Sequence, residues 1–198
     1  MLQRLPSPEK TDEPWLNGAG RTTVLAVERS SQAWRWRISI AHIDRSAPFS
    51  ALPGVARQMA SLDACVDLRF ADARQVRLAR LEVARFAGDP PPFAELPEGP
   101  TRAFNLMTRD WPAILLARTL VDSLLLPAAP AWLLHGIAGD IAVCDTAGGQ
   151  GLPLRTGESI QVEGQARLEG QGEIVLVRFD RWEAPTATRN DLTDPGAR

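Results

Sequence analysis

Short apolar runs recur along almost the whole chain, with turn-forming residues between them. Seven runs carry the pattern: TTVLAVE, RWRISIA, VDLRF, VRLARLEVARF, AILLARTLV, DIAVC and EIVLVRFD. They are short and rich in β-branched residues, which favours strands over helices. Many short strands at this spacing are typical of a β-sandwich or β-barrel. We therefore expect an all-β fold, in which a brief helix or a turn is expected around residues 54–59.

The size and charge of the chain limit the kinds of partner it can have. Its 198 residues suit one large β domain or two small ones. The formal net charge is -2, with 22 basic and 24 acidic residues interspersed. Because there is no basic stripe, we expect no nucleic-acid partner, which leaves small molecules or proteins.

The compartment is predicted from the cysteines and from the most apolar segments. Cys65 and Cys144 lie far apart and outside any CxxC pattern, so neither a disulfide framework nor a zinc knuckle is indicated. The first ten residues lack the apolar core of a signal peptide, and two prolines interrupt the most apolar segment, LLLPAAPAWLLH. We expect a soluble, cytoplasmic protein with no membrane partner.

The stretch EPWLNGAGRT at residues 13–22 suits a phosphate cradle, a hairpin turn or a ligand-site loop. It lacks the glycine spacing of a dinucleotide fingerprint and the glycine–lysine pair of a P-loop. The segment that follows is rich in β-branched residues and predicts a strand. Asn17 and Gly18 favour a tight turn, because both residues tolerate a positive φ. We predict a hairpin corner here.

Residues 35–41 alternate with a period of two. One face of the predicted strand carries Trp36, Ile38 and Ile40 and is expected to be core. The other face carries Arg37 beside Ser39. A guanidinium and a hydroxyl suit a carboxylate if this face lines a cavity, and form an ordinary solvent-facing surface if it does not.

The residue content gives little support for a metal site or for a catalytic site. The two histidines, His42 and His135, form no HxH or HxxxH pair, whereas a metal-binding cupin needs several histidines with a carboxylate. We expect no metal and no other cofactor. Acid–base catalysis without a metal would pair His42 with Asp44 or Asp63, and the spacing selects neither. The chain also lacks a GxSxG elbow for a serine nucleophile.

Four motifs follow one another over residues 14–109: PWLNGAGRT, WRISIA, PFSALPGVAR and FNLMTR. Together they resemble the HutD/Ves family of bacterial proteins, which is similar in length. The resemblance implies a bicupin, with two small antiparallel β-barrels or sandwiches in one chain. The family is associated with histidine utilisation or stress response, and no catalysed reaction is firmly attached to it. A proposed role is to bind a small acidic intermediate of histidine breakdown, such as formylglutamate.

The resemblance also implies a domain organisation. Residues 1–185 are expected to form a single bicupin domain, with the motif-bearing barrel first and a degenerate cupin half after it. In that later half Arg167 stands near the usual position of a metal-binding histidine. Residues 186–198 are expected to form a polar C-terminal tail.

The resemblance to the family implies two sets of site residues in this sequence. The implied ligand-binding residues are Asn17, Arg37, Ser39, Ser50, Arg57 and Asn105. The implied pocket or structural residues are Trp15, Gly18, Gly20, Thr22, Phe49, Pro53, Gly54 and Met107. Two motif arginines favour an anionic ligand. Simpler roles stay open. Trp15 is also suited to be a core anchor, and Ser50 is suited to cap a turn. The two arginines are also suited to form ion pairs with neighbouring acids.

The sequence as a whole favours a non-catalytic bicupin that binds a small carboxylate metabolite of the formylglutamate kind, with a regulatory role in histidine utilisation. Two alternatives stay open. One is a metal-free isomerase or hydrolase of a small acid, and the other is a protein-interaction scaffold with a vestigial pocket. A homodimer is also compatible with the sequence.

Overall fold

The structure is a computed structural model that describes residues 1–6, 12–15, 17–29, 33–146 and 151–185. Throughout these residues the chain forms strands joined by turns, without a helix. The predicted all-β class is confirmed. In this part of the chain no helix has the length and apolarity needed to cross a membrane. The predicted polar tail, residues 186–198, lies outside the described residues.

The chain divides into two compact units. One consists of Pro8–Trp111 with Glu183–Arg198, and we call it the motif unit because the four sequence motifs lie in it. The other consists of Met1–Ser7 with Pro112–Trp182, and we call it the C-terminal unit. Each unit has its own cluster of buried apolar side chains.

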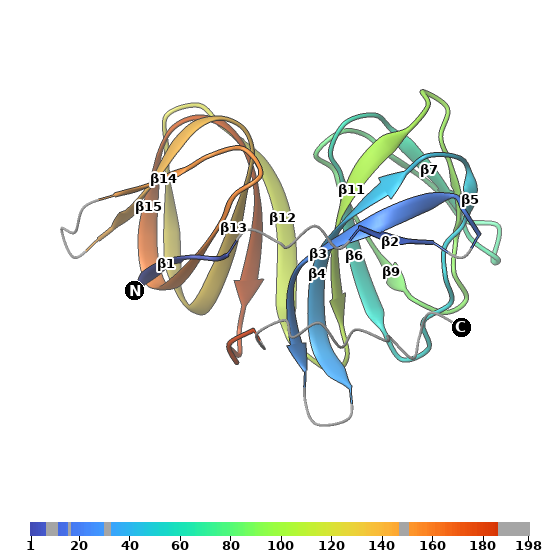
Figure 1. The fold of residues 1–198 in the computed structure, drawn as a ribbon, viewed down its shortest axis with the longest axis horizontal. Coiled ribbons are helices and arrows are strands. Elements are labelled where there is room, and N and C mark those ends of the chain that lie inside the picture. The colour runs from blue at the N-terminus through green and yellow to red at the C-terminus, as the bar shows by residue number, and fades with distance from the viewer. Residues whose placement is uncertain (7–11, 16, 30–32, 147–150, 186–198) are drawn as a thin grey trace. The chain divides into compact units, whose positions relative to one another are not determined.

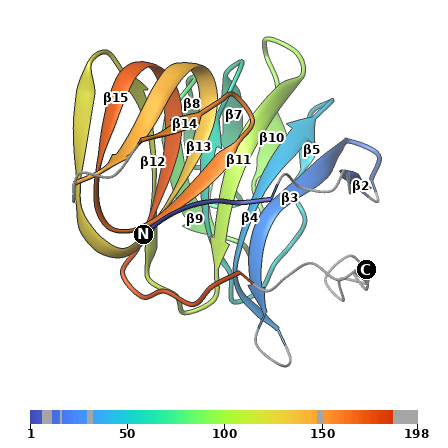
Figure 2. The same ribbon diagram turned by 60° about the vertical axis from the view of Figure 1, so that its left-hand side comes forward.

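Two long, bent strands form the framework of the C-terminal unit. In β13 (Ser123–Asp145), Trp132 lies opposite Val162 on one side and opposite Arg178 on the other, and both partners belong to β15 (Ser159–Phe179). This double pairing curls the sheet round on itself, as the curved ribbons of β13 and β15 show in Figure 2. The remaining strands of the sheet are β1 (Leu2–Arg4), β12 (Ala113–Leu120) and β14 (Leu152–Leu154).

Strand β1 belongs to the C-terminal unit although it comes first in the sequence. Its residues Leu2 and Arg4 lie opposite Val162 and Ile160 of β15. Figure 1 shows β1, in dark blue, beside the orange β15. The Arg4 guanidinium also pairs with the carboxylate of Glu158. Residues 1–6 thus belong to the C-terminal unit, and the chain returns to this unit at Pro112.

Two sheets form the motif unit. The larger has the strand order β2 (Asp12–Pro14), β3 (Gly20–Arg29), β4 (Trp34–Ile43), β11 (Thr101–Thr108), β6 (Ala56–Ser61) and β9 (Val83–Ala87). The smaller has the order β5 (Ala47–Pro48), β10 (Phe93–Glu95), β7 (Val66–Arg69) and β8 (Gln75–Leu78). Buried side chains from both sheets, among them Met59 and Leu68, form one core cluster.

The glycine-rich stretch forms the predicted hairpin corner between β2 and β3. The side-chain oxygen Oδ1 of Asn17 accepts a hydrogen bond from the backbone N–H of Ala19 at 3.0 Å, and Gly18 has a φ of 63°. A Cβ at Gly20 would lie 2.1 Å from the carbonyl oxygen of His42 on β4. Glycine is needed at Gly20 because the two backbones approach too closely there for a side chain.

Strand β4 follows the predicted alternation. Trp36, Ile38 and Ile40 are buried, as predicted. The opposite face is not in solvent, since Ser39 is 1% exposed and Ala41 belongs to the core cluster of the motif unit. The polar face of β4 therefore points into this unit.

The expectation of a brief helix or turn over residues 54–59 is wrong for most of the segment. A turn occurs at Gly54, where φ is 72°, but β6 begins at Ala56. This strand pairs with β11 on one side and with β9 on the other. Pairing on both sides decides the conformation of residues whose own preference is weak.

Candidate functional site

A cavity of about 430 Å³ lies in the motif unit. Its floor is the inward face of the six-stranded sheet, and its rim comes from the β2–β3 hairpin and from the segment after β5. All six residues predicted to bind a ligand line this cavity, as do four of the other predicted residues. These ten are Trp15, Asn17, Thr22, Arg37, Ser39, Phe49, Ser50, Arg57, Asn105 and Met107.

Four predicted residues are not among those that line the cavity: Gly18, Gly20, Pro53 and Gly54. The first two shape the hairpin corner described above. Gly54 lies in the turn before β6, and the carbonyl oxygen of Pro53 accepts a hydrogen bond from Arg109 at 3.0 Å. These residues set the direction of the chain around the cavity.

Strand register brings the residues of the cavity floor together. Ser39 of β4 lies opposite Asn105 of β11, while Arg37 lies opposite Met107, which in turn lies opposite Arg57 of β6. Residues directly opposite in neighbouring strands project to the same face of a sheet. Three segments far apart in the sequence therefore present their polar side chains to one cavity.

Arg57 is a buried cation at the cavity. It is 6% exposed, and its guanidinium lies 4.7 Å from the ring centre of Phe49 and 5.2 Å from that of Phe86. Its Nη2 donates to Oδ1 of Asn105 at 3.3 Å, whereas its Nε has no hydrogen-bond partner among the described residues. Burial, followed by the charge of Arg37, lowers the pKa of Arg57 from its ordinary value to about 10, so the group remains charged at neutral pH.

Arg37 lies nearer the cavity mouth and already contacts an acid. Its Nη2 is 2.9 Å from the carboxylate of Glu13 on β2, and their side chains are 15% and 35% exposed. The amide of Asn105 is held in place by a hydrogen bond of 3.2 Å from Nδ2 to the carbonyl oxygen of Ala103. The two cavity arginines thus differ in that Arg37 is paired with a carboxylate, while Arg57 is held by a neutral amide and two aromatic rings.

The predicted pocket residue Trp15 and the predicted ligand-binding residue Asn17 also have structural partners. Trp15 donates from Nε1 to the hydroxyl of Thr22 at 2.8 Å, and its ring packs edge-on against Phe49 with centroids 6.2 Å apart. Asn17 holds the hairpin turn and donates from Nδ2 to the carbonyl oxygen of Pro48 at 3.4 Å. Both residues stabilise the cavity rim as well as facing the cavity.

The motifs that build this cavity belong to a recognised family. The HutD family model matches residues 7–176. The chain belongs to the HutD family. No curated protein sequence matches it.

Solved structures establish the fold of this HutD-family chain. A conserved protein of unknown function from Pseudomonas aeruginosa PAO1 superposes with a TM-score of 0.82 at 25% identity, covering 91% of this chain and 100% of that chain. HutD from Pseudomonas fluorescens SBW25 superposes with a TM-score of 0.75 at 22% identity, covering 92% and 100%. The pirin YhhW from Escherichia coli, in complex with nickel(II), has a TM-score of 0.62 at 10% identity and covers 90% and 99%. The predicted bicupin fold is confirmed.

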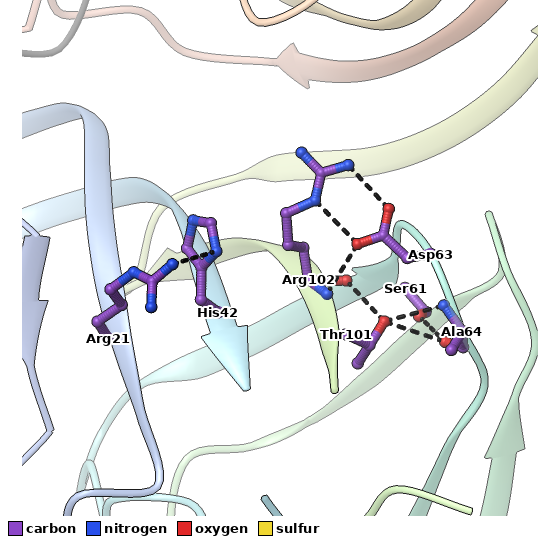
Figure 3. Close-up of polar contacts among 7 residues, drawn as sticks. All are labelled: Arg21, His42, Ser61, Asp63, Ala64, Thr101 and Arg102. Atoms are coloured by element: carbon purple, nitrogen blue, oxygen red, sulfur yellow. Dashed lines mark hydrogen bonds and ion pairs between the residues drawn. The ribbon is translucent and has the colours of Figure 1, made fainter. Parts of the chain in front are cut away.

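The acids considered for catalysis lie beside arginines in this HutD-family protein, as Figure 3 shows for Asp63. Asp63 accepts hydrogen bonds from Nε and Nη2 of Arg102, both at 2.8 Å, and from the Arg102 backbone N–H at 3.1 Å. Nδ1 of His42 lies 3.4 Å from Nη2 of Arg21. The hydrogen bonds from Arg102 hold the pKa of Asp63 below its ordinary value of 3.8, which makes its carboxylate a weak base.

Asp63→Asn is expected to lower the free energy of unfolding by about 0.5–1 kcal/mol at pH 7, since exposed ion pairs contribute little. The folded pKa of Asp63 is depressed, so this stabilisation is present above the ordinary pKa of 3.8 and is lost as the pH falls through the folded value. Urea unfolding of both proteins at pH 7 and pH 2 measures the effect. A difference between the two proteins that is as large at pH 2 as at pH 7 would contradict it.

The two histidines lie in different units, His42 in the motif unit and His135 in the C-terminal unit. Nδ1 of His135 is 2.8 Å from the hydroxyl of Ser159, and both residues are buried. Within the described part of this HutD-family chain, no three His, Cys, Asp or Glu side chains gather closely enough to hold a metal ion. The polar groups that line the cavity include the guanidinium groups of Arg37 and Arg57 and the amides of Asn17 and Asn105.

Sequence reasoning missed two neighbours of the predicted arginines, Glu13 and Phe86. Glu13 lies opposite Thr22 in the β2–β3 hairpin, so hairpin register applied to the predicted Thr22 would have found it. Phe86 lies opposite Arg57 across β6 and β9, a pairing that no local signal indicates.

Proposed function

We propose that this HutD-family chain binds a small carboxylate-bearing metabolite in the cavity of the motif unit. The observation that carries the proposal is Arg57, a buried guanidinium that no carboxylate among the described residues neutralises. A buried charge without a counter-ion is costly, and an anionic ligand would offset that cost. A guanidinium also matches the planar geometry of a carboxylate better than an ammonium does.

The neighbouring groups suit a ligand that carries an amide as well as a carboxylate. Arg37 offers a second guanidinium, and Ser39 and Asn105 supply a hydroxyl and an amide on the same face of the sheet. These are neutral donors and acceptors that complement a formyl or amide group. Formylglutamate, the ligand that the family resemblance implies, presents both kinds of group.

The proposed role is binding without chemical conversion, as part of the regulation of histidine utilisation in the cytoplasm. Among the described residues that line the cavity, Glu13 is the one carboxylate, and it is paired with Arg37. A general base must lie within hydrogen-bond reach of the proton that it removes. Glu13 is the most exposed of the charged lining residues, whereas Arg57, the cation that would hold the ligand carboxylate, is buried. The cavity is therefore better suited to hold an acid than to transform it.

Isothermal calorimetry with formylglutamate, urocanate and glutamate tests the proposal. Binding is expected to raise the melting temperature, because a ligand at about 100 times its dissociation constant stabilises the folded state by about 2.7 kcal/mol. Arg37→Ala is expected to abolish that rise while the unliganded variant stays folded, since Arg37 lies at the cavity and not in the core cluster.

A matched control is Arg69→Ala. Arg69 pairs with Glu95 on the smaller sheet and is not among the lining residues, so ligand binding should persist in this variant. The proposal fails if no acid binds at millimolar concentration, or if Arg37→Ala binds as tightly as the unaltered protein.

A further inference from the structure

We infer that Glu13 restricts this cavity to ligands with a single negative charge, so that the preferred ligand is a monocarboxylate with a neutral tail. The inference rests on the proposed function and specifies the class of ligand. It assigns a specificity role to a residue at the cavity mouth, and it follows from the charges and their depths in the cavity.

The net charge of the residues that line the cavity can be balanced by one negative charge on a ligand. Among the described lining residues the charged ones are Arg37, Arg57 and Glu13. Two guanidinium groups and one carboxylate leave a single net positive charge. A monoanion neutralises that charge, whereas a dianion would leave an uncompensated negative charge in a partly buried site.

The three charged residues lie at different depths in the cavity, and this difference fixes the orientation of the ligand. Arg57 is 6% exposed, the Arg37 side chain is 15% exposed and the Glu13 side chain is 35% exposed. The deepest cation is the one that lacks a carboxylate partner among the described residues. The carboxylate of a ligand therefore goes to Arg57 and Asn105, and the other end of the ligand lies toward Glu13.

Strand register holds the Glu13 carboxylate in this position. Glu13 lies opposite Thr22 in the antiparallel pair of β2 and β3, and Thr22 itself lines the cavity. Moving Glu13 to the other face would need a slip of one residue in the hairpin, which the turn at Asn17 opposes. A second ligand carboxylate near Arg37 would therefore meet a fixed like charge.

The remaining surface of the cavity suits a neutral tail. Apolar side chains make up much of the rim and wall, among them Trp15, Pro48, Phe49 and Leu52. An amide, an uncharged ring or a short aliphatic chain can pack there without a desolvated charge. Formylglutamate, with two carboxylates, should then bind less tightly than a monoanion of the same shape.

Calorimetry with N-formylglutamate and N-formylglutamine tests this inference, because the two molecules differ only in one carboxylate replaced by a carboxamide. The unaltered protein is expected to bind N-formylglutamine at least about tenfold more tightly, the effect of a like charge at contact distance in a partly exposed site. Glu13→Gln should remove most of that preference, chiefly by tightening the binding of N-formylglutamate. Glu13→Ala is a second variant that removes the charge.

The matched control is Asp72→Asn, which also removes one negative charge from the motif unit. Asp72 is exposed and accepts a hydrogen bond from the Arg74 backbone, which asparagine can preserve, and it does not line the cavity. This variant should keep the preference of the unaltered protein. The inference is overturned if N-formylglutamate binds as tightly as its amide analogue, or if both Glu13 variants keep the full preference. If neither compound nor any other small acid binds, the proposed function falls as well.

Discussion

Replacing Ile38 by alanine is expected to lower the free energy of unfolding by about 2–5 kcal/mol, because the change leaves a cavity at a fully buried position. Ile38 is 0% exposed and lies in the middle of β4, opposite Ala26 of β3 on one side and Leu106 of β11 on the other. Both neighbours belong to a continuous sheet, so the backbone cannot readily close over the lost methyl groups. Urea unfolding followed by tryptophan fluorescence measures the loss.

Val121→Ala is the control for this change. Val121 is 71% exposed, and its truncation should alter the free energy of unfolding by no more than about 0.5 kcal/mol. Comparable effects for the two substitutions would show that Ile38 is not part of the packed interior.

Arg57→Met is expected to abolish anion binding and to stabilise the unliganded protein by roughly 1–3 kcal/mol. The substitution removes a buried charge whose depressed pKa reflects the cost of its burial. Methionine is similar in length and can keep contact with the rings of Phe49 and Phe86 through its thioether. Thermal unfolding without ligand and calorimetry with N-formylglutamine measure the two effects.

The variant Arg57→Lys tests whether anion binding depends on the positive charge of Arg57 or on the planar shape of its guanidinium. Lysine keeps the positive charge but not the planar fork, so binding should weaken without a gain in stability. If Arg57→Met is less stable than the unaltered protein and still binds the acid, then Arg57 is a structural residue and the anion site lies elsewhere.

The fold and part of the site could be predicted because some signals are local. The alternation of Trp36, Ile38 and Ile40 with polar residues defined a strand whose two faces differ. The same alternation put Arg37 and Ser39 together, and β4 does present both to the cavity. Such an alternation can be recognised in the sequence because side chains in a strand point alternately to its two faces.

Other features depend on pairings between distant segments and could not be predicted locally. Whether the polar face of β4 meets solvent or a cavity is decided by the smaller sheet, which completes the core cluster. The position of Asn105 opposite Ser39 and of Phe86 opposite Arg57 is set by inter-strand register. Residues 56–61 form a strand because β9 and β11 lie on either side of it.

The pairing of β1 with β15 has a consequence for the folding of the protein during translation. Leu2–Arg4 are translated before the ten strands of the motif unit that the structure describes, and their partners at residues 160–162 are translated after those strands. At about 5–20 residues per second that delay is on the order of ten seconds, long enough for the strands of the motif unit to pair before the β15 partner of β1 is made. Strand β1 is therefore made before the motif unit but paired after it. A chaperone that holds β1 during translation would delay completion of the C-terminal sheet rather than assembly of the cavity in the motif unit.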